Sequence, residues 1–120
     1  MWGPTSPFEQ RTATGLRHWR RLPVVRFEWG PAKNARNVRK HGISFEEAST
    51  LFTSGSDWLD LDDEAHSEDE LRYRAIGPIA RGVVVVVYVE REEDVLRVIS
   101  ARLATPTERR LYTKRIERNL

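Results

Sequence analysis

The segment RGVVVVVYVE, residues 81–90, constrains the fold more than any other stretch of the chain. Its five consecutive valines show no alternation of apolar and polar residues, so they predict a strand buried on both faces, in the middle of a sheet. Valine favours strands because its stiff, branched side chain suits a pleated surface. The charged residues REED (91–94) predict a short exposed hairpin loop. The following segment, DVLRVISARLA (94–104), predicts the partner strand.

Length and composition indicate one highly charged globular domain. The chain has 120 residues, of which 32% are charged, and a net charge of +2. It contains no cysteine, which excludes disulfides and thiolate metal sites and suits a reducing compartment. No apolar run approaches the roughly 20 residues of a membrane span, and the arginine-rich N-terminus lacks the apolar core of a signal peptide. We expect a cytoplasmic protein without membrane association.

Charge is segregated along the chain. Residues 57–70 hold eight acids and no Lys or Arg, whereas residues 33–40 hold four bases and no acid. Residues 102–118 hold six bases against two acids, and arginine outnumbers lysine seventeen to three. An excess of arginine favours bidentate contacts to phosphate or carboxylate groups. The alternative is that these charged surfaces are only solvated.

The first part of the chain shows no clear periodicity. Residues 1–23 include several Gly and Pro residues and the basic sequence LRHWRR. They predict a flexible basic extension ahead of a single domain at residues 24–120. The extension is either a basic arm that touches nucleic acid or an unselected tail, for example from a start codon placed too early.

A helical hairpin is expected next. VVRFEW (24–29) predicts a short strand, and Pro31 opens a helix because proline at the first helical position needs no N–H. Gly42 ends this helix. Ser44 begins a second helix through a capping box with Glu47, three residues later.

The second half of the chain predicts four consecutive strands and a final helix. Strands at 57–61 and 71–76, the latter ended by Gly77-Pro78, precede the two central strands. Thr105 and Glu108 form the capping box of the last helix. Consecutive strands with short connections usually pair with their neighbours. We therefore expect an α+β fold with an N-terminal strand and helical hairpin, a four-stranded antiparallel sheet with helices packed on one face, and a C-terminal helix.

The candidate chemistry depends on basic and acid/base side chains at the ends of these elements. No metal-ligand motif is present, because the three histidines are far apart in the sequence. Converging cations could hold a phosphodiester and stabilise the charge that develops on it. A nearby His, Glu or Tyr could remove a ribose 2′-hydroxyl proton. The catalytic candidates are His41, Arg72, Arg74, Arg102, Glu108, Arg109 and Tyr112, and the RNA-binding candidates are Lys33, Lys40, Arg110 and Lys114.

Each acid/base candidate also has a structural alternative. Glu108 is explained by helix capping alone, and Arg102 by an ion pair with the acidic loop at 62–70. His41 supplies a favourable charge near a helix C-terminus. Tyr112 suits a core contact better than the role of a base.

Three blocks of the sequence resemble the BrnT toxin family. They are FEWGPAKNARNVRKHGISFEEASTLF, HSEDELRYRAIG and RVISARLATPTERRLY, which extend in order from Phe27 to Tyr112. One departure is Gly30, which stands where the family usually has Asp before the proline. Glycine is a tolerable helix cap, so the change costs about a few tenths of a kcal/mol.

The resemblance implies a ribonuclease toxin of a type II toxin–antitoxin system, with a RelE-like fold and no metal cofactor. It implies translation arrest, neutralisation by a BrnA-type antitoxin with a ribbon-helix-helix DNA-binding part, and an oligomeric complex that represses its own operon. It also implies phosphate-binding or transition-state roles for Arg72, Arg74, Arg102 and Arg109, and acid/base roles for His41, Glu108 and Tyr112. A rival function is a catalytically inactive binding module that acts as antitoxin partner or co-repressor.

Overall fold

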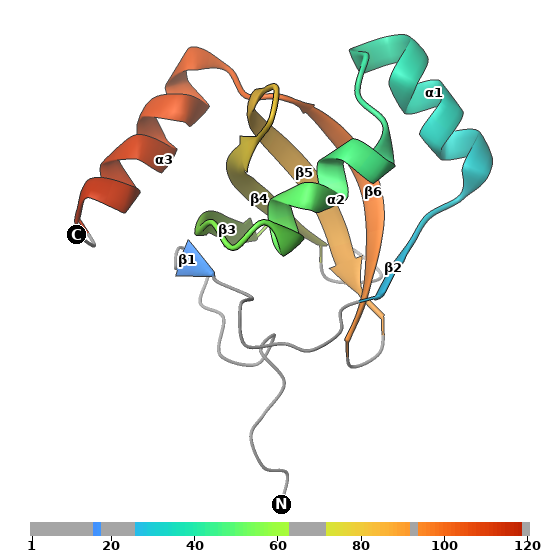
Figure 1. Ribbon diagram of the computed structural model, residues 1–120, viewed down its shortest axis with the longest axis horizontal. Helices are drawn as coiled ribbons and strands as arrows, with labels where there is room; N and C mark the ends of the chain where they lie inside the picture. The colour runs from blue at the N-terminus through green and yellow to red at the C-terminus, as the bar shows by residue number, and fades with distance from the viewer. Residues whose placement is uncertain (1–15, 18–25, 63–71, 92–93, 119–120) are drawn as a thin grey trace, which may run out of the picture.

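The chain folds as a mixed sheet with helices on both faces (Figure 1). A computed structural model describes residues 16–17, 26–62, 72–91 and 94–118. The sheet order is β1-β3-β4-β5-β6-β2. The elements are β1 (Leu16–Arg17), β2 (Arg26–Glu28), α1 (Pro31–His41), α2 (Phe45–Thr53), β3 (Trp58–Asp62), β4 (Arg72–Ile79), β5 (Gly82–Glu90), β6 (Val95–Leu103) and α3 (Pro106–Arg118).

The strands β3 to β6 pair as the expected antiparallel meander, but the sheet extends further on both sides. Strand β2 pairs with β6 in parallel orientation. Between β2 and the first strand of the meander, the chain passes through α1 and α2. Strand β1 adds to β3 in antiparallel orientation. The prediction of a RelE-like sheet of four antiparallel strands is therefore wrong in strand number and in the direction of one edge strand. Apart from β1, the predicted N-terminal extension lies outside the described residues.

The valine run is the centre of the molecule, as predicted. Strand β5 lies between β4 and β6, and Val84, Val85 and Val86 are all buried. Val84 and Val86 pack with α2 in one core cluster, whereas Val85 packs in a second cluster on the other face. Successive strand residues point to opposite faces, so an unbroken apolar run fits a strand that is covered on both.

The helices do not all lie on one face of the sheet, which corrects the prediction. Helix α2 packs through Phe45, Leu51 and Phe52 in the first cluster, together with Trp58 of β3. Helix α3 contributes Tyr112 to the second cluster, on the opposite face (Figure 1). The sequence of α3 carries too few apolar residues to predict this docking. None of the described helices has the length and apolar character that crossing a bilayer requires.

The predicted helix starts and stops are confirmed. Gly30 caps α1 with Pro31 following it, and Gly42 ends α1 in the left-handed conformation at φ 74°. Ser44 and Glu47 form the reciprocal capping box of α2.

Strand β4 continues through Gly77 and Pro78 to Ile79, instead of ending before them. The pairing of β3 with β4 ends at Ile76. No residue of β3 is therefore paired with Pro78, and the N–H group that proline lacks is not needed there. Gly77 permits the close approach of two elements. A Cβ atom at this position would lie 2.5 Å from Leu51 Cδ1 and 2.9 Å from Trp58 Cβ.

We expect Gly77→Ala to destabilise the fold by about 2–3 kcal/mol, as overpacked cores do. The Trp58 Cβ atom is fixed by the backbone of β3 and cannot move aside as a flexible side-chain end would. Urea unfolding measures the loss. Gly30→Ala is the control, because its new methyl group would lie 3.8 Å from Arg97 Nη2, an ordinary contact. Equal stability of the two variants would contradict this packing.

Candidate active site

The three candidate arginines of the sheet share one face. In the register, Arg72 lies opposite Val89, Arg74 opposite Val87, and Val85 opposite Arg102. Val85, Val87 and Val89 are alternate residues of β5, so their side chains point to one face of the sheet. Val85 packs on the side that α3 covers. The sheet therefore presents all three arginines to the face that α3 covers.

Arg74 and Arg102 lie two strands apart and two register positions apart. With strands about 4.8 Å apart and a rise of about 3.3 Å per residue, their Cα atoms are about 12 Å apart. Both side chains are long and only partly buried. Two arginine side chains at this Cα spacing are long enough to reach one phosphodiester group.

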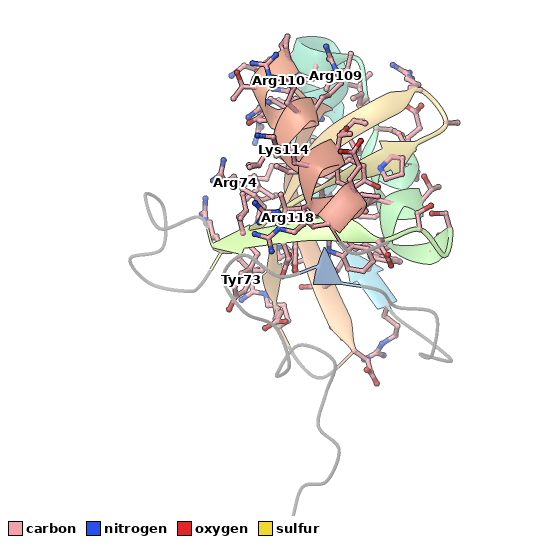
Figure 2. All side chains as sticks on the ribbon, turned by 90° about the vertical axis from the view of Figure 1, so that its left-hand side faces the viewer. Tyr73, Arg74, Arg109, Arg110, Lys114 and Arg118 are labelled. Atoms are coloured by element: carbon pink, nitrogen blue, oxygen red, sulfur yellow. The ribbon has the colours of Figure 1, made fainter. Side chains whose placement is uncertain are left out.

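Helix α3 lies on the same face of the sheet and carries a row of exposed cations. Figure 2 looks onto α3 and shows Arg109, Arg110, Lys114 and Arg118 along it, with Arg74 on the strand beyond; α3 contacts both β3 and β4. We call this set the arginine face. It comprises Arg72, Arg74, Arg102, Arg109, Arg110, Lys114 and Arg118.

A bidentate ion pair fixes Arg102 at the start of α3. Its Nη1 and Nη2 atoms donate to Glu108 Oε1 and Oε2 at 2.8 and 2.9 Å. Glu108 Oε1 also accepts the Thr105 N–H at 2.8 Å, and the Glu108 N–H donates to the Thr105 hydroxyl at 3.2 Å. The predicted capping box is thus present, and its carboxylate also orients the guanidinium group. Arg102 therefore pairs with Glu108, and its alternative partner, the acidic loop at 62–70, lies mostly outside the described residues.

This arrangement makes Glu108 a weak base. Its hydrogen bonds from Arg102, followed by those from Thr105, lower the pKa of Glu108 from 4.5 to about 2 despite partial burial. The same pair raises the pKa of Arg102. Both groups are charged across the physiological range, so Glu108 is well suited to holding Arg102 and poorly suited to accepting a proton.

We expect the Glu108–Arg102 pair to stabilise the protein by about 1–2 kcal/mol at neutral pH, a discounted value because the Arg102 side chain is 37% exposed. The folded pKa of Glu108 lies below the ordinary value, so the contribution is complete above pH 4.5 and is lost as the pH falls towards 2. Urea unfolding of the wild type and Glu108→Gln should differ at pH 7, and the difference should shrink below pH 4.5 and vanish only below about pH 2. A difference that stays constant with pH would contradict the ion pair.

Tyr112 is held as a structural contact. Its hydroxyl donates to the Asp57 carbonyl at 3.1 Å, and its ring packs against the second core cluster. Burial, followed by the charge of Asp57, raises the pKa of Tyr112. The phenol is thus harder to deprotonate than usual, so the observed geometry matches the core-contact alternative. Its acid/base role stays a prediction.

The candidates on α1 lie away from the arginine face. His41 ends α1 and is partly exposed, and Lys33 and Lys40 are exposed on the same helix. Helix α1 is fixed to β6 by Asn37, which bonds to Ala101 on the side of the first core cluster. The structure therefore does not bring these three residues together with the arginines that α3 covers.

Arg118 belongs to the arginine face but was not among the predicted residues. Arg110, Lys114 and Arg118 repeat at intervals of four, so they form one row along α3. This spacing is visible in the sequence and could have identified Arg118. In the described ranges, no three His, Asp or Glu side chains gather as a metal ion would require.

Comparison with known proteins identifies the family. Residues 29–108 match the family model described as the ribonuclease toxin BrnT of type II toxin–antitoxin systems. The chain belongs to the BrnT family. The matched range contains five of the seven predicted catalytic residues, namely His41, Arg72, Arg74, Arg102 and Glu108.

A solved BrnT structure has the same architecture. The chain is 25% identical to the ribonuclease toxin BrnT of Brucella abortus, with a TM-score of 0.54. The superposition covers 68% of this chain and 99% of the Brucella protein. A comparison with curated proteins gives no match. The predicted family, and with it the type II toxin and ribonuclease class, is confirmed.

Proposed function

We propose that this BrnT toxin cleaves RNA without a metal ion, by using the arginine face to bind and activate a phosphodiester. The family match, which spans the sheet arginines and Glu108, is the observation that carries this proposal. RNA supplies its own nucleophile, the 2′-hydroxyl, so the protein needs only to bind the phosphate, stabilise charge and help to move protons.

In the proposed reaction, the 2′-oxygen attacks the adjacent phosphorus atom and the bond from phosphorus to the 5′-oxygen breaks. The products are a 2′,3′-cyclic phosphate and a 5′-hydroxyl, and the proton lost by the 2′-oxygen is balanced by the one gained by the 5′-oxygen. Arg74 and Arg102 stabilise the negative charge on the non-bridging oxygens. Glu108 acts as a positioning residue for Arg102, because the bidentate pair fixes the direction of the guanidinium group.

The acid/base step has fewer candidates than the binding step. The low pKa of Glu108 and the partly buried hydrogen bond of Tyr112 argue against either as the base. The predicted acid/base residue His41 lies away from the arginine face, so we propose that solvent accepts the proton. Electrostatic stabilisation by preorganised cations is usually the largest catalytic contribution, so the arginines carry most of the proposed rate enhancement.

The remaining family properties are proposals for this chain. We infer a cytoplasmic translation inhibitor that is silenced by a BrnA-type ribbon-helix-helix antitoxin, and an oligomeric complex that represses its own operon through the antitoxin. The arginine face is the surface that silencing must cover, since a covered phosphate site cannot bind RNA. A purified complex that cleaves RNA as fast as the free toxin would contradict this.

Cleavage of a labelled RNA by the purified chain in excess EDTA tests the activity. The proposal expects cleavage that EDTA does not inhibit and that an Arg74→Ala/Arg102→Ala variant lacks while keeping its circular dichroism spectrum. Complete inhibition by EDTA, with activity restored by added Mg²⁺, would overturn the metal-independent mechanism. A folded protein that cleaves no RNA, alone or with ribosomes, would favour an inactive co-repressor.

A further inference from the structure

Helix α1 carries a second cationic surface. Lys33, Arg36, Arg39 and Lys40 are all exposed, and the helix contains no acidic residue. In the described part of the chain, no ion pair engages any of these four side chains. By contrast, Arg81 and Arg97 each lie beside a carboxylate, at 2.9 and 3.3 Å.

This surface is separate from the arginine face. Asn37 anchors α1 to β6 at Ala101, in the first core cluster, whereas Tyr112 anchors α3 in the second cluster across the sheet. Figure 1 shows α1 and α3 on opposite sides of the molecule. One phosphate group cannot therefore contact both helices, and α1 requires a ligand of its own or a distant part of the same ligand.

The chemistry of α1 suits a regular row of phosphates. Lys33, Arg36 and Lys40 follow the i, i+3, i+7 spacing, and Arg39 lies one turn beyond Arg36. The four cations therefore line one side of the helix over about 10 Å. Helix α1 contains no Phe, Tyr or Trp on which an unpaired base could stack, and its one imidazole, His41, lies at the C-terminal end. Proteins that bind single strands usually combine cations with such stacking. Cations without stacking partners instead match the backbone of a duplex.

We propose that α1 is a second RNA-binding surface, which contacts the sugar–phosphate backbone of a double-stranded segment while the arginine face acts on a single-stranded segment. The choice of RNA rests on the proposed function, and the choice of a duplex rests on the composition of α1. On this basis the toxin prefers cleavage sites beside a stem over the same sequence in an unstructured strand.

The test uses an RNA hairpin with 2′-O-methyl groups throughout, which has no free 2′-hydroxyl to attack. Arg36→Gln/Arg39→Gln removes two charges from α1 and keeps good helix-forming residues. We expect the Kd for the hairpin to rise by about tenfold at 0.1 M salt, and the slope of log Kd against log salt to fall by about 1–2. Arg26→Gln/Arg91→Gln is the control with matched charge, located outside α1 at the start of β2 and just ahead of β6, and should change the Kd less than twofold.

The same variants separate this inference from the proposed activity. Cleavage of a short single-stranded oligonucleotide should be unchanged in Arg36→Gln/Arg39→Gln, and a loss there would place α1 in the cleavage site and overturn the inference. An unchanged hairpin Kd would also overturn it. Equal affinity for a DNA duplex and the RNA hairpin would do the same, as would a variant that differs from the wild type only in self-association. If no variant cleaves RNA but hairpin binding weakens only in the α1 variant, the proposed activity fails and the α1 surface stands.

Discussion

Arg102→Ala is expected to lower kcat/KM for RNA cleavage by about 10²–10³-fold, the usual effect of removing one preorganised donor from a site of developing charge. Arg102 is partly buried and held at two points by Glu108, so its charge needs no reorganisation when the transition state forms. Single-turnover cleavage of a labelled oligonucleotide, with enzyme in excess, measures the effect.

Two further variants separate loss of the guanidinium group from loss of folding. Arg102→Ala/Glu108→Gln removes the arginine without leaving an unpaired carboxylate, and it should be as inactive as Arg102→Ala but more stable. Arg97→Ala removes another ion-paired arginine of β6 and should keep activity within a few-fold. Full activity in Arg102→Ala, or equal losses in Arg97→Ala and Arg102→Ala, would contradict the assigned role.

The largest expected effect on stability comes from Asn37, which no sequence pattern distinguishes. Its Nδ2 atom donates to the carbonyls of Ile43 at 2.9 Å and Ala101 at 2.8 Å. Its Oδ1 atom accepts the Ala101 N–H at 3.2 Å. The side chain is the buried polar link between α1, the loop that follows it and β6. Asn37→Ala would leave buried backbone groups without partners, so we expect a loss of about 3–4 kcal/mol.

Urea and thermal unfolding of Asn37→Ala test this expectation. The matched control is Asn34→Ala, which removes an asparagine from the same helix. Asn34 donates to Glu46 at 3.0 Å at an exposed site and accepts the Phe45 N–H at 2.8 Å, so its loss should cost about half as much. An Asn37→Ala variant as stable as Asn34→Ala would show that the buried link is not what holds α1 on the sheet.

The sequence predicted the elements whose signals are local. The valine run, Pro31, the Ser44–Glu47 box and the Thr105–Glu108 box each depend on residues within a few positions of one another, and the structure confirms all four. The edge strands were not predicted as parts of the sheet. Strand β2 has three residues and β1 has two, so their pairing depends on distant strands and leaves no periodic signal.

The candidate site was predictable as a set of residues but only partly as an arrangement. Arg72 and Arg74 are two residues apart on one strand, so the sequence alone predicts that both side chains lie on the same face of the sheet. The position of Arg102 relative to them depends on the β4–β5–β6 register, which includes a bulge between Val87 and Tyr88. His41, Lys33 and Lys40 lie apart from the arginines because α3 docks on the opposite face of the sheet from α1. The mostly charged sequence of α3 carries little information about the face on which it docks.

The central claim is that the arginine face activates a phosphodiester for attack by the RNA's own 2′-hydroxyl. The most direct measurement is cleavage, in excess EDTA, of two oligonucleotides that differ only by a single 2′-deoxy substitution beside the scissile phosphate, with products identified by mass spectrometry. We predict that the all-RNA strand yields a 2′,3′-cyclic phosphate and a 5′-hydroxyl, and that the substituted strand resists cleavage at that bond. Equal cleavage of both strands, or release of a linear phosphate from the outset, would contradict the mechanism.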